Sequence, residues 1–241
     1  MYDYLIVIPA RYDSTRFPGK PLVDICGKSM IQRVWEKCVE ALNAEQVIIA
    51  TDDDRIIKHC QEKKMNTVLT SKNCLTGTDR IHEVSNKIKS QIYINVQGDE
   101  PLILAEDIQK IIKQSKANPS SVINGMANIK SSTDHQNPNI PKVVVDKKNN
   151  LLFMSRGAIP ISKNLEFISA KKQVCIYAFP YEALNIYGSI NKKTPLEQIE
   201  DIEILRFLEM GINVKMVELS DSSIAVDVPE DLKKVISVIN D

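Results

Sequence analysis

Short apolar strands alternate with helical stretches through the first half of this 241-residue chain. Residues 4–9 form a continuous apolar run of the kind that is buried on both faces of a sheet. Three further strand-like runs follow at 47–50, 67–70 and 92–96, with helix-spaced apolar residues between them. Such an alternation is typical of a mainly parallel sheet flanked by helices. We therefore expect an α/β fold.

The second half of the chain has a different rhythm. Turn-rich stretches separate short β-like runs, at 142–145, 151–154 and 174–179. This pattern predicts an inserted β-rich lobe. Beyond it the sequence predicts, in order, a helix at 199–210, strands at 214–217 and 223–226, and a terminal helix that opens at Pro229. We expect one domain over residues 1–241, with a first half (about 1–120), the lobe (about 121–190) and a return to the core (about 191–241).

Composition excludes several classes of function. Apolar residues make up 43% of the chain, and 31 basic residues balance 31 acidic ones. That balance argues against a broad nucleic-acid or membrane-binding face, which needs clustered positive charge. Five scattered cysteines without a CxxC pair suggest neither a disulfide framework nor a zinc site. The amino-terminal run is short and carries an acid at position 3, so we expect no signal peptide and a cytoplasmic location.

Polar loops follow three of the predicted strands, at 10–20, 51–54 and 97–101. Ligands of parallel sheets bind at the carboxyl ends of the strands, so these loops should converge. The first loop carries three cations, Arg11, Arg16 and Lys20, in a chain without net charge. A triphosphate would explain that local excess. The alternative is a solvated basic loop, and neither a Walker loop nor a GxGxxG fingerprint is present.

Two aspartates are candidate metal ligands. Asp99 follows a buried strand and faces the crevice at the strand ends. Magnesium is usually held by one or two carboxylates together with substrate phosphates, so Asp99 suits it. Asp227 ends the predicted strand at 223–226 and is the second candidate. The alternatives are a turn-forming Gly-Asp pair for Asp99 and an ordinary helix N-cap for Asp227.

Eight short motifs spread over the chain resemble those of the CMP-Kdo synthetase (3-deoxy-manno-octulosonate cytidylyltransferase) family. They are PARYxSxRxPGKPL at 9–22, ATDDD at 50–54, TGTDR at 76–80, NVQGDEP at 95–101, NPNxxKVV at 137–144, SRxxIP at 155–160, PLExIExxExLR at 195–206 and VDxPEDL at 226–232. The resemblance implies a Rossmann-like nucleotidyltransferase fold, a homodimer, and a Mg²⁺-dependent reaction of CTP with a 3-deoxy-2-keto sugar acid, Kdo above all. The product would supply lipopolysaccharide or capsule synthesis.

The resemblance also implies roles for individual residues. Lys20, Arg16, Asp99 and Asp227 would be catalytic, and the two aspartates would share the Mg²⁺. The nucleotide would contact Pro9, Ala10, Arg11, Ser14, Arg16, Lys20, Ser71, Thr78, Asp79 and Arg80. The sugar acid would contact Gln97, Arg156, Gln173, Tyr177, Glu203 and Ile204. No nucleic-acid or membrane partner is implied.

Two of these sugar-facing positions depart from the family pattern. Gln173 stands where the family has His in HxGIYxY, and Ile204 stands where it has Gln after Glu203. These changes favour a retuned acceptor pocket, which leaves an amino-substituted Kdo such as 8-amino-Kdo, or another ulosonic or nonulosonic acid, as the alternative substrate. A sugar-1-phosphate nucleotidyltransferase is disfavoured because its glycine-rich first loop is absent. A non-catalytic sugar-nucleotide-binding protein is disfavoured because Lys20, Asp99 and Asp227 are all present.

Overall fold

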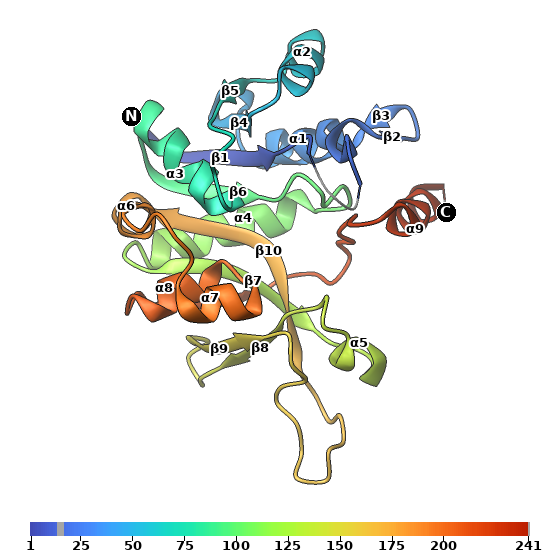
Figure 1. Ribbon diagram of the computed structural model, residues 1–241, viewed down its shortest axis with the longest axis vertical. Helices are drawn as coiled ribbons and strands as arrows, with labels where there is room; N and C mark the ends of the chain where they lie inside the picture. The colour runs from blue at the N-terminus through green and yellow to red at the C-terminus, as the bar shows by residue number, and fades with distance from the viewer. Residues whose placement is uncertain (14–16, 241) are drawn as a thin grey trace.

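A twisted sheet forms the centre of the computed structural model, which describes residues 1–13 and 17–240 (Figure 1). Within the described residues the sheet has nine strands, and its main path runs β11-β7-β10-β6-β1-β4-β5. These strands are β1 (Tyr2–Ala10), β4 (Val47–Thr51), β5 (Thr67–Leu69), β6 (Ser90–Val96), β7 (Val122–Asn128), β10 (Lys171–Pro180) and β11 (Val214–Glu218).

Strand direction confirms the prediction of a mainly parallel sheet. The β1 strand pairs in parallel with β4 and β6, and β4 with β5, so these carboxyl ends lie along one edge. Only β10, among these seven strands, runs against its neighbours, between β6 and β7. The parallel pair β7 and β11 completes the path.

Helices cover both faces of the sheet because successive apolar side chains of each central strand point to opposite faces. On one face Ile6 and Ile8 pack in a cluster with α1 (Met30–Ala41), α2 (Asp54–Glu62) and α4 (Ala105–Ala117). On the other face Leu5 and Val7 belong to a cluster that includes α3 (Gly77–Lys87), α6 (Tyr181–Gly188) and α8 (Ile204–Glu209). Alternate side chains of a strand point to opposite faces, so a strand buried on both faces is apolar throughout. None of the helices in the described ranges has the length and apolar character needed to cross a bilayer.

The predicted β-rich segments form a small lobe on the β10 edge. The strands β8 (Lys142–Val145) and β9 (Leu151–Ser155) pair antiparallel, and β8 also pairs with the start of β10. Short helix α5 (Ser132–Gln136) lies beside them, and residues 156–170 extend away from the body as a long loop (Figure 1).

Smaller elements complete the first half of the chain. They are η1 (Lys20–Leu22), β2 (Asp24–Ile25), β3 (Lys28–Ser29) and η2 (Ala44–Gln46).

Two predictions for the last third of the chain are wrong. The single helix expected at 199–210 is two short helices, α7 (Pro195–Glu200) and α8, because Asp201 adopts a left-handed conformation with φ 51° between them. The strand expected at 223–226 is an extended segment outside the sheet, whose Val226 N–H donates to the Asp99 carbonyl at 2.9 Å. This segment leads into α9 (Pro229–Asn240), the terminal helix that the sequence predicts.

Candidate active site

A pocket of about 270 Å³ opens at the carboxyl ends of β1 and β6. Its wall combines the ends of these strands with η1, the start of α3 and the corner between α7 and α8. The lining residues are Pro9, Ala10, Arg11, Lys20, Pro21, Met30, Cys74, Leu75, Thr76, Gly77, Arg80, Gln97, Gly98, Asp99, Lys193, Asp201, Glu203 and Asp227. The loops that follow β1 and β6 therefore meet here, as the sequence predicts.

The strand ends can approach so closely because of two glycines. A Cβ on Gly98 would lie 2.9 Å from the Pro9 carbonyl oxygen, so a larger residue would force the two loops apart. Gly19 has φ +72°, which favours glycine, and its N–H donates to the Tyr12 carbonyl at 3.0 Å. This closed turn places Lys20 at the pocket wall.

Lys20 lies between the two predicted metal ligands. Its ammonium nitrogen is 2.7 Å from a carboxylate oxygen of Asp99 and 3.6 Å from one of Asp227. The Lys20 side chain is 12% exposed, whereas the two aspartates are 30% and 40% exposed. Two carboxylates thus share one cation and remain open to the pocket.

The chain fixes each aspartate through its backbone. The Asp99 carbonyl accepts from Val226 N–H, which ties the two carboxylate-bearing loops together. The Asp231 carboxylate accepts from the backbone N–H groups of Asp227 and Val228 at 3.2 and 3.3 Å, and this fixes the turn that presents Asp227. The metal candidates are therefore held from two different parts of the sequence.

The third polar loop, 51–54, contacts the pocket through Arg80. Arg80 is buried and donates to the Asp52 carboxylate at 2.9 Å, to the Thr70 hydroxyl and to the Ser71 carbonyl. Its charge is thus paired within the protein, although it lines the pocket. Ser71, another predicted nucleotide contact, is exposed and lies outside the lining.

Glu203 reaches the pocket at the start of α3. Its carboxylate accepts from the N–H groups of Gly77 and Thr78, at 3.1 and 2.9 Å, and from the Thr78 hydroxyl. Burial raises the pKa of the Glu203 carboxyl above its usual value, while the bonds from Thr78 and Gly77 act in the opposite direction. Thr78 is thereby engaged by Glu203, and Gln97 lies in the pocket lining.

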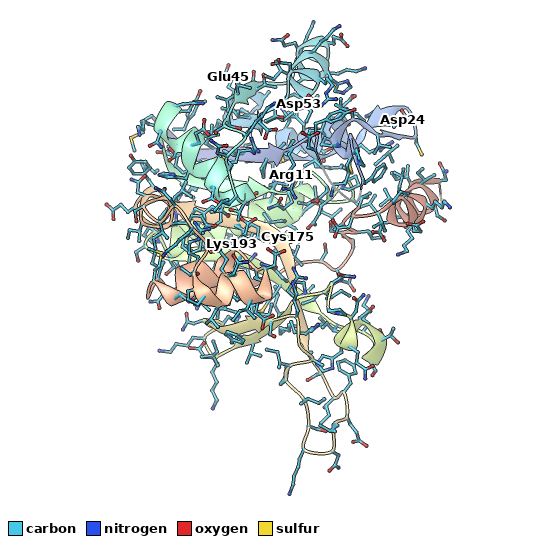
Figure 2. All side chains as sticks on the ribbon, viewed as in Figure 1. Arg11, Asp24, Glu45, Asp53, Cys175 and Lys193 are labelled. Atoms are coloured by element: carbon cyan, nitrogen blue, oxygen red, sulfur yellow. The ribbon has the colours of Figure 1, made fainter. Side chains whose placement is uncertain are left out.

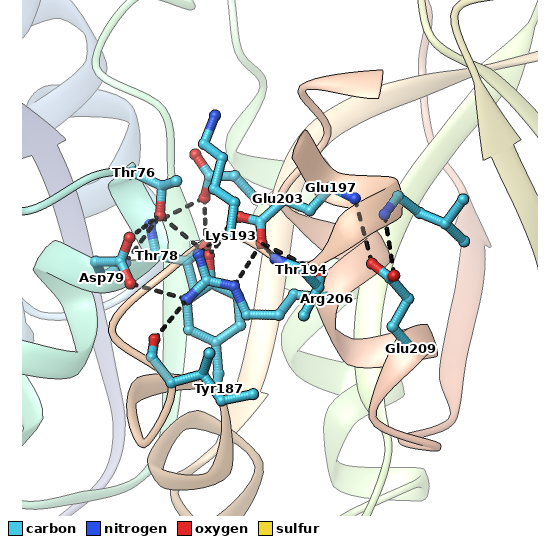
Figure 3. Close-up of polar contacts among 12 residues, drawn as sticks. Thr76, Thr78, Asp79, Tyr187, Lys193, Thr194, Glu197, Glu203, Arg206 and Glu209 are labelled. Carbon is cyan, nitrogen blue, oxygen red and sulfur yellow. Dashed lines mark hydrogen bonds and ion pairs between the residues drawn. The ribbon is translucent and has the colours of Figure 1, made fainter. Parts of the chain in front are cut away.

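Arg206 holds α3, α7 and α8 together (Figure 3). This fully buried guanidinium donates twice to Glu197, at 2.6 and 2.7 Å, and once to Asp79, at 3.1 Å. It also lies 3.7 Å from the centre of the Tyr187 ring. Asp79, a predicted nucleotide contact, therefore faces Arg206 and the Thr76 hydroxyl rather than the pocket.

Four of the predicted sugar contacts lie outside the pocket lining, and three of them, Arg156, Gln173 and Tyr177, form hydrogen bonds within the protein. Gln173 donates to Asn124 at 3.0 Å and to the Tyr177 hydroxyl at 3.1 Å. Arg156 donates to the carbonyls of Glu200 and Asp201 at 2.5 and 3.0 Å. These residues brace β10 and the corner between α7 and α8.

The prediction that Ile204 contacts the sugar acid is wrong. The Ile204 side chain is 1% exposed and packs in the core cluster of the α3, α6 and α8 face. It therefore does not face the pocket, because α8 turns this position inward while Glu203 remains at the pocket wall. The family difference at Ile204 changes the core and not the ligand surface.

The predicted phosphate-binding residues are brought together in part. Pro9, Ala10, Arg11 and Lys20 line the pocket. Ser14 and Arg16 lie outside the described residues.

Two charged residues of the pocket wall were missed from the sequence. Lys193 and Asp201 both line the pocket, and the Lys193 ammonium lies 2.5 Å from the Asp201 carboxylate. Figure 2 labels both Lys193 and Arg11 in the middle part of the molecule. The sequence feature that could have indicated Lys193 is the pair of lysines directly before the Thr-Pro-Leu-Glu run at 194–197, where a helix starts.

Comparisons with known proteins identify the family of this chain. A family model described as "Cytidylyltransferase" matches residues 5–218. The chain is 38% identical over 235 residues to the 3-deoxy-manno-octulosonate cytidylyltransferase of Escherichia coli, covering 98% of this chain and 95% of the relative. It is 37% identical over 241 residues to the mitochondrial enzyme of that name from Arabidopsis thaliana, covering 98% and 82%.

Solved structures give the same result. A CMP:2-keto-3-deoxy-manno-octonic acid synthetase complexed with CTP superposes with a TM-score of 0.92 at 37% identity, covering 98% of each chain. A putative glucose-1-phosphate thymidylyltransferase from Bacillus anthracis shares the fold alone, with a TM-score of 0.70 at 13% identity, covering 99% of this chain and 96% of that one. The chain therefore belongs to the CMP-Kdo synthetase (3-deoxy-manno-octulosonate cytidylyltransferase) family of nucleotidyltransferases.

Proposed function

We propose that this chain transfers CMP from CTP to the anomeric hydroxyl of Kdo and releases diphosphate, with Mg²⁺ as cofactor. The observation that carries the proposal is the shared contact of Lys20 with Asp99 and Asp227 at the wall of the strand-end pocket. A cation between two carboxylates, next to a loop suited to phosphates, fits a reaction that gathers negative charge at phosphorus. The relatives' names supply the nucleotide and the acceptor.

The donor set fits magnesium. Asp99 and Asp227 offer oxygen ligands, which Mg²⁺ prefers. Both carboxylates already attract one positive charge, the ammonium of Lys20. Within residues 1–13 and 17–240 no group of three or more His, Cys, Asp or Glu side chains gathers as a metal cage. Two carboxylates completed by substrate phosphates and water are the usual arrangement for this ion. When bound, Mg²⁺ would neutralise phosphate charge and lower the pKa of the acceptor hydroxyl.

The chain's own residues then have simple roles. Arg11 and Lys20 would bind phosphate oxygens and offset the charge that develops as diphosphate departs. Asp99 and Asp227 would orient the reacting groups for in-line attack on the α-phosphorus. Positioning and electrostatics therefore account for the catalysis, without a protein general base.

The acceptor would lie toward Gln97 and Glu203, which line the same pocket as Arg11 and Lys20. Gln97 offers an amide donor and acceptor, and Glu203 offers carboxylate oxygens next to the start of α3. Gln173 would act on the sugar through Tyr177, which it contacts. An 8-amino-substituted Kdo or another ulosonic acid stays the second candidate acceptor because of the family difference at Gln173.

We further propose a homodimer in the cytoplasm whose product feeds lipopolysaccharide or capsule synthesis. The lobe supports the dimer, because Leu165 and Ile168 in its long loop are 75% and 76% exposed. Large exposed apolar side chains gathered on one projecting segment favour a protein contact.

The test is diphosphate release measured with CTP, UTP, ATP and GTP against Kdo, 8-amino-Kdo and a sialic acid, with and without EDTA. We expect CTP to be clearly preferred, UTP to be a weak second, and EDTA to abolish turnover. Equal use of ATP or GTP, or full activity in EDTA, would contradict the proposal.

A further inference from the structure

The pair formed by Lys193 and Asp201 has no part in the mechanism above, although both side chains line the pocket. The ammonium and the carboxylate are 2.5 Å apart. The hydrogen bond from Lys193 holds the pKa of the Asp201 carboxyl below its usual value, so the pair is ionic at neutral pH. Asp201 is 70% exposed and Lys193 is 22% exposed, which leaves the carboxylate open to a ligand.

The backbone beneath this pair is fixed on both sides. Asp201 adopts its left-handed conformation at the corner between α7 and α8, where its carbonyl accepts from Arg156. Lys193 directly precedes Thr194, the N-cap residue of α7, which forms a capping box with Glu197. Glu197 in turn is held by the buried Arg206. A charged pair on two fixed backbone segments is suited to binding a ligand, because little conformational entropy is lost when the ligand binds.

Charge balance indicates which part of the acceptor the pair suits. The pair is neutral as a whole, and the nearby Arg156 guanidinium donates to the carbonyls of Glu200 and Asp201 and lies 4.0 Å from the Asp201 carboxylate. Arg11 lines the same pocket, and its positive charge helps to lower the pKa of the Asp201 carboxyl. An anion should bind Arg11, because a guanidinium pairs with carboxylates and phosphates. A neutral polyol suits a paired ammonium and carboxylate, because one group donates to a hydroxyl and the other accepts from one.

We propose that Lys193 and Asp201 bind the hydroxyl groups of the acceptor's side chain and so determine its length and substitution. This inference rests on the proposed function. The pair contributes little to stability, as is usual for exposed ion pairs. Its removal should therefore change acceptor use without changing the fold. An acceptor with an amino group in this region would be attracted by Asp201 and repelled by Lys193.

The experiment compares Asp201→Asn and Lys193→Met with the wild type in steady-state assays of diphosphate release. Asparagine tolerates the left-handed conformation, and methionine keeps the length of the lysine without its charge. We expect each variant to raise the KM for Kdo about tenfold, since a hydrogen bond to a charged group is worth about 1.5–3 kcal/mol. The KM for CTP and the melting temperature should stay near the wild-type values.

A second ion pair provides the matched control. Lys171 and Glu218 are also 2.5 Å apart, with similar exposures of 26% and 63%, and both lie outside the pocket lining. Glu218→Gln and Lys171→Met should leave both KM values unchanged. A rise in the KM for Kdo in these controls equal to that in the pocket variants would overturn the inference.

A shortened acceptor separates polyol binding from a general disturbance of the pocket. With a 3-deoxy-2-keto acid that lacks the terminal hydroxymethyl group, the tenfold difference between wild type and variants should largely disappear. An undiminished difference, an unchanged KM for Kdo, or an equal rise in the KM for CTP would each contradict the inference. A wild-type protein that releases no diphosphate from CTP with any sugar acid would instead refute the proposed function, and the inference with it.

Discussion

The ammonium of Lys20 lies 2.7 Å from the carboxylate of Asp99, at the edge where β1 and β6 end. The same ammonium lies 3.6 Å from Asp227. One lysine thus compensates two carboxylates that the sequence separates by more than a hundred residues. This arrangement holds the two aspartates close to the same positive charge at the pocket wall.

Asp99→Asn should abolish most of the activity while preserving the fold. The change keeps the size of the side chain and removes a charge from the proposed metal site. Loss of such a ligand costs several kcal/mol of transition-state stabilisation, so turnover should fall about a thousandfold. The measurement is turnover at saturating Mg²⁺, with melting temperature as the check on folding. Asp24→Asn, at an exposed aspartate outside the pocket, is the control, and retention of more than about a tenth of the activity by Asp99→Asn would exclude Asp99 as a ligand.

Lys20→Gln should have opposite effects on metal affinity and on turnover. Without the ammonium, Asp99 and Asp227 repel each other and attract a divalent cation more strongly. We expect Mn²⁺ to bind the nucleotide-free variant more tightly than the wild type, by about tenfold, since 1.4 kcal/mol is tenfold in affinity. Turnover should fall because a phosphate contact is lost. Calorimetry in the absence of CTP makes the first measurement, and weaker Mn²⁺ binding by the variant would show that the two carboxylates do not share a cation.

Ile204→Gln should destabilise the protein rather than change its substrate. The side chain is buried in the core, where a glutamine amide would lack hydrogen-bond partners. An unsatisfied buried polar group costs about 1–3 kcal/mol. Urea denaturation should show that loss, whereas the ratio of kcat/KM for Kdo to that for 8-amino-Kdo should not change. Ile204→Val is the control for a simple loss of volume, and a changed substrate ratio with unchanged stability would place Ile204 at the ligand after all.

Glu203→Gln tests the buried carboxyl through the pH dependence of stability. Burial raises the pKa of Glu203 above its usual 4.5, so the folded state binds this proton more tightly than the unfolded state does. The contribution is therefore fully present below about pH 4.5 and is lost as pH rises through the folded-state pKa. The free energy of unfolding of the wild type, minus that of the glutamine variant, should decrease between pH 4.5 and pH 7.

The control for this titration is Glu209→Gln. Bonds from the backbone of α7 contribute to a lowered pKa at Glu209, so its difference curve should slope in the opposite direction, below pH 4.5. A flat difference curve for Glu203→Gln would contradict the raised pKa.

The alternating strands and helices of the first half were predictable because their signals are local. A strand buried on both faces is apolar throughout, and an amphipathic helix repeats its apolar residues every three to four positions. The runs at 4–9 and 92–96 therefore identify β1 and β6 directly. The loops of a parallel sheet must meet at one edge, so the proximity of Lys20 and Asp99 also followed from the sequence.

Tertiary contacts decided what local pattern could not. The apolar spacing of 199–210 predicts one helix, yet Arg156 binds the carbonyls at 200 and 201 and stabilises a break there. The break turns Asp201 and Glu203 toward the pocket and Ile204 into the core, which no helical period anticipates. The placement of Lys193 likewise depends on the buried bonds of Arg206 to Glu197 and Asp79. The sequence by itself determined the alternating strands and helices of the first half and the polar loops that follow the strand ends, because these follow from local periodicity. Only the tertiary structure decided which side chains of residues 193–204 line the pocket, because that choice depends on bonds between residues far apart in the chain.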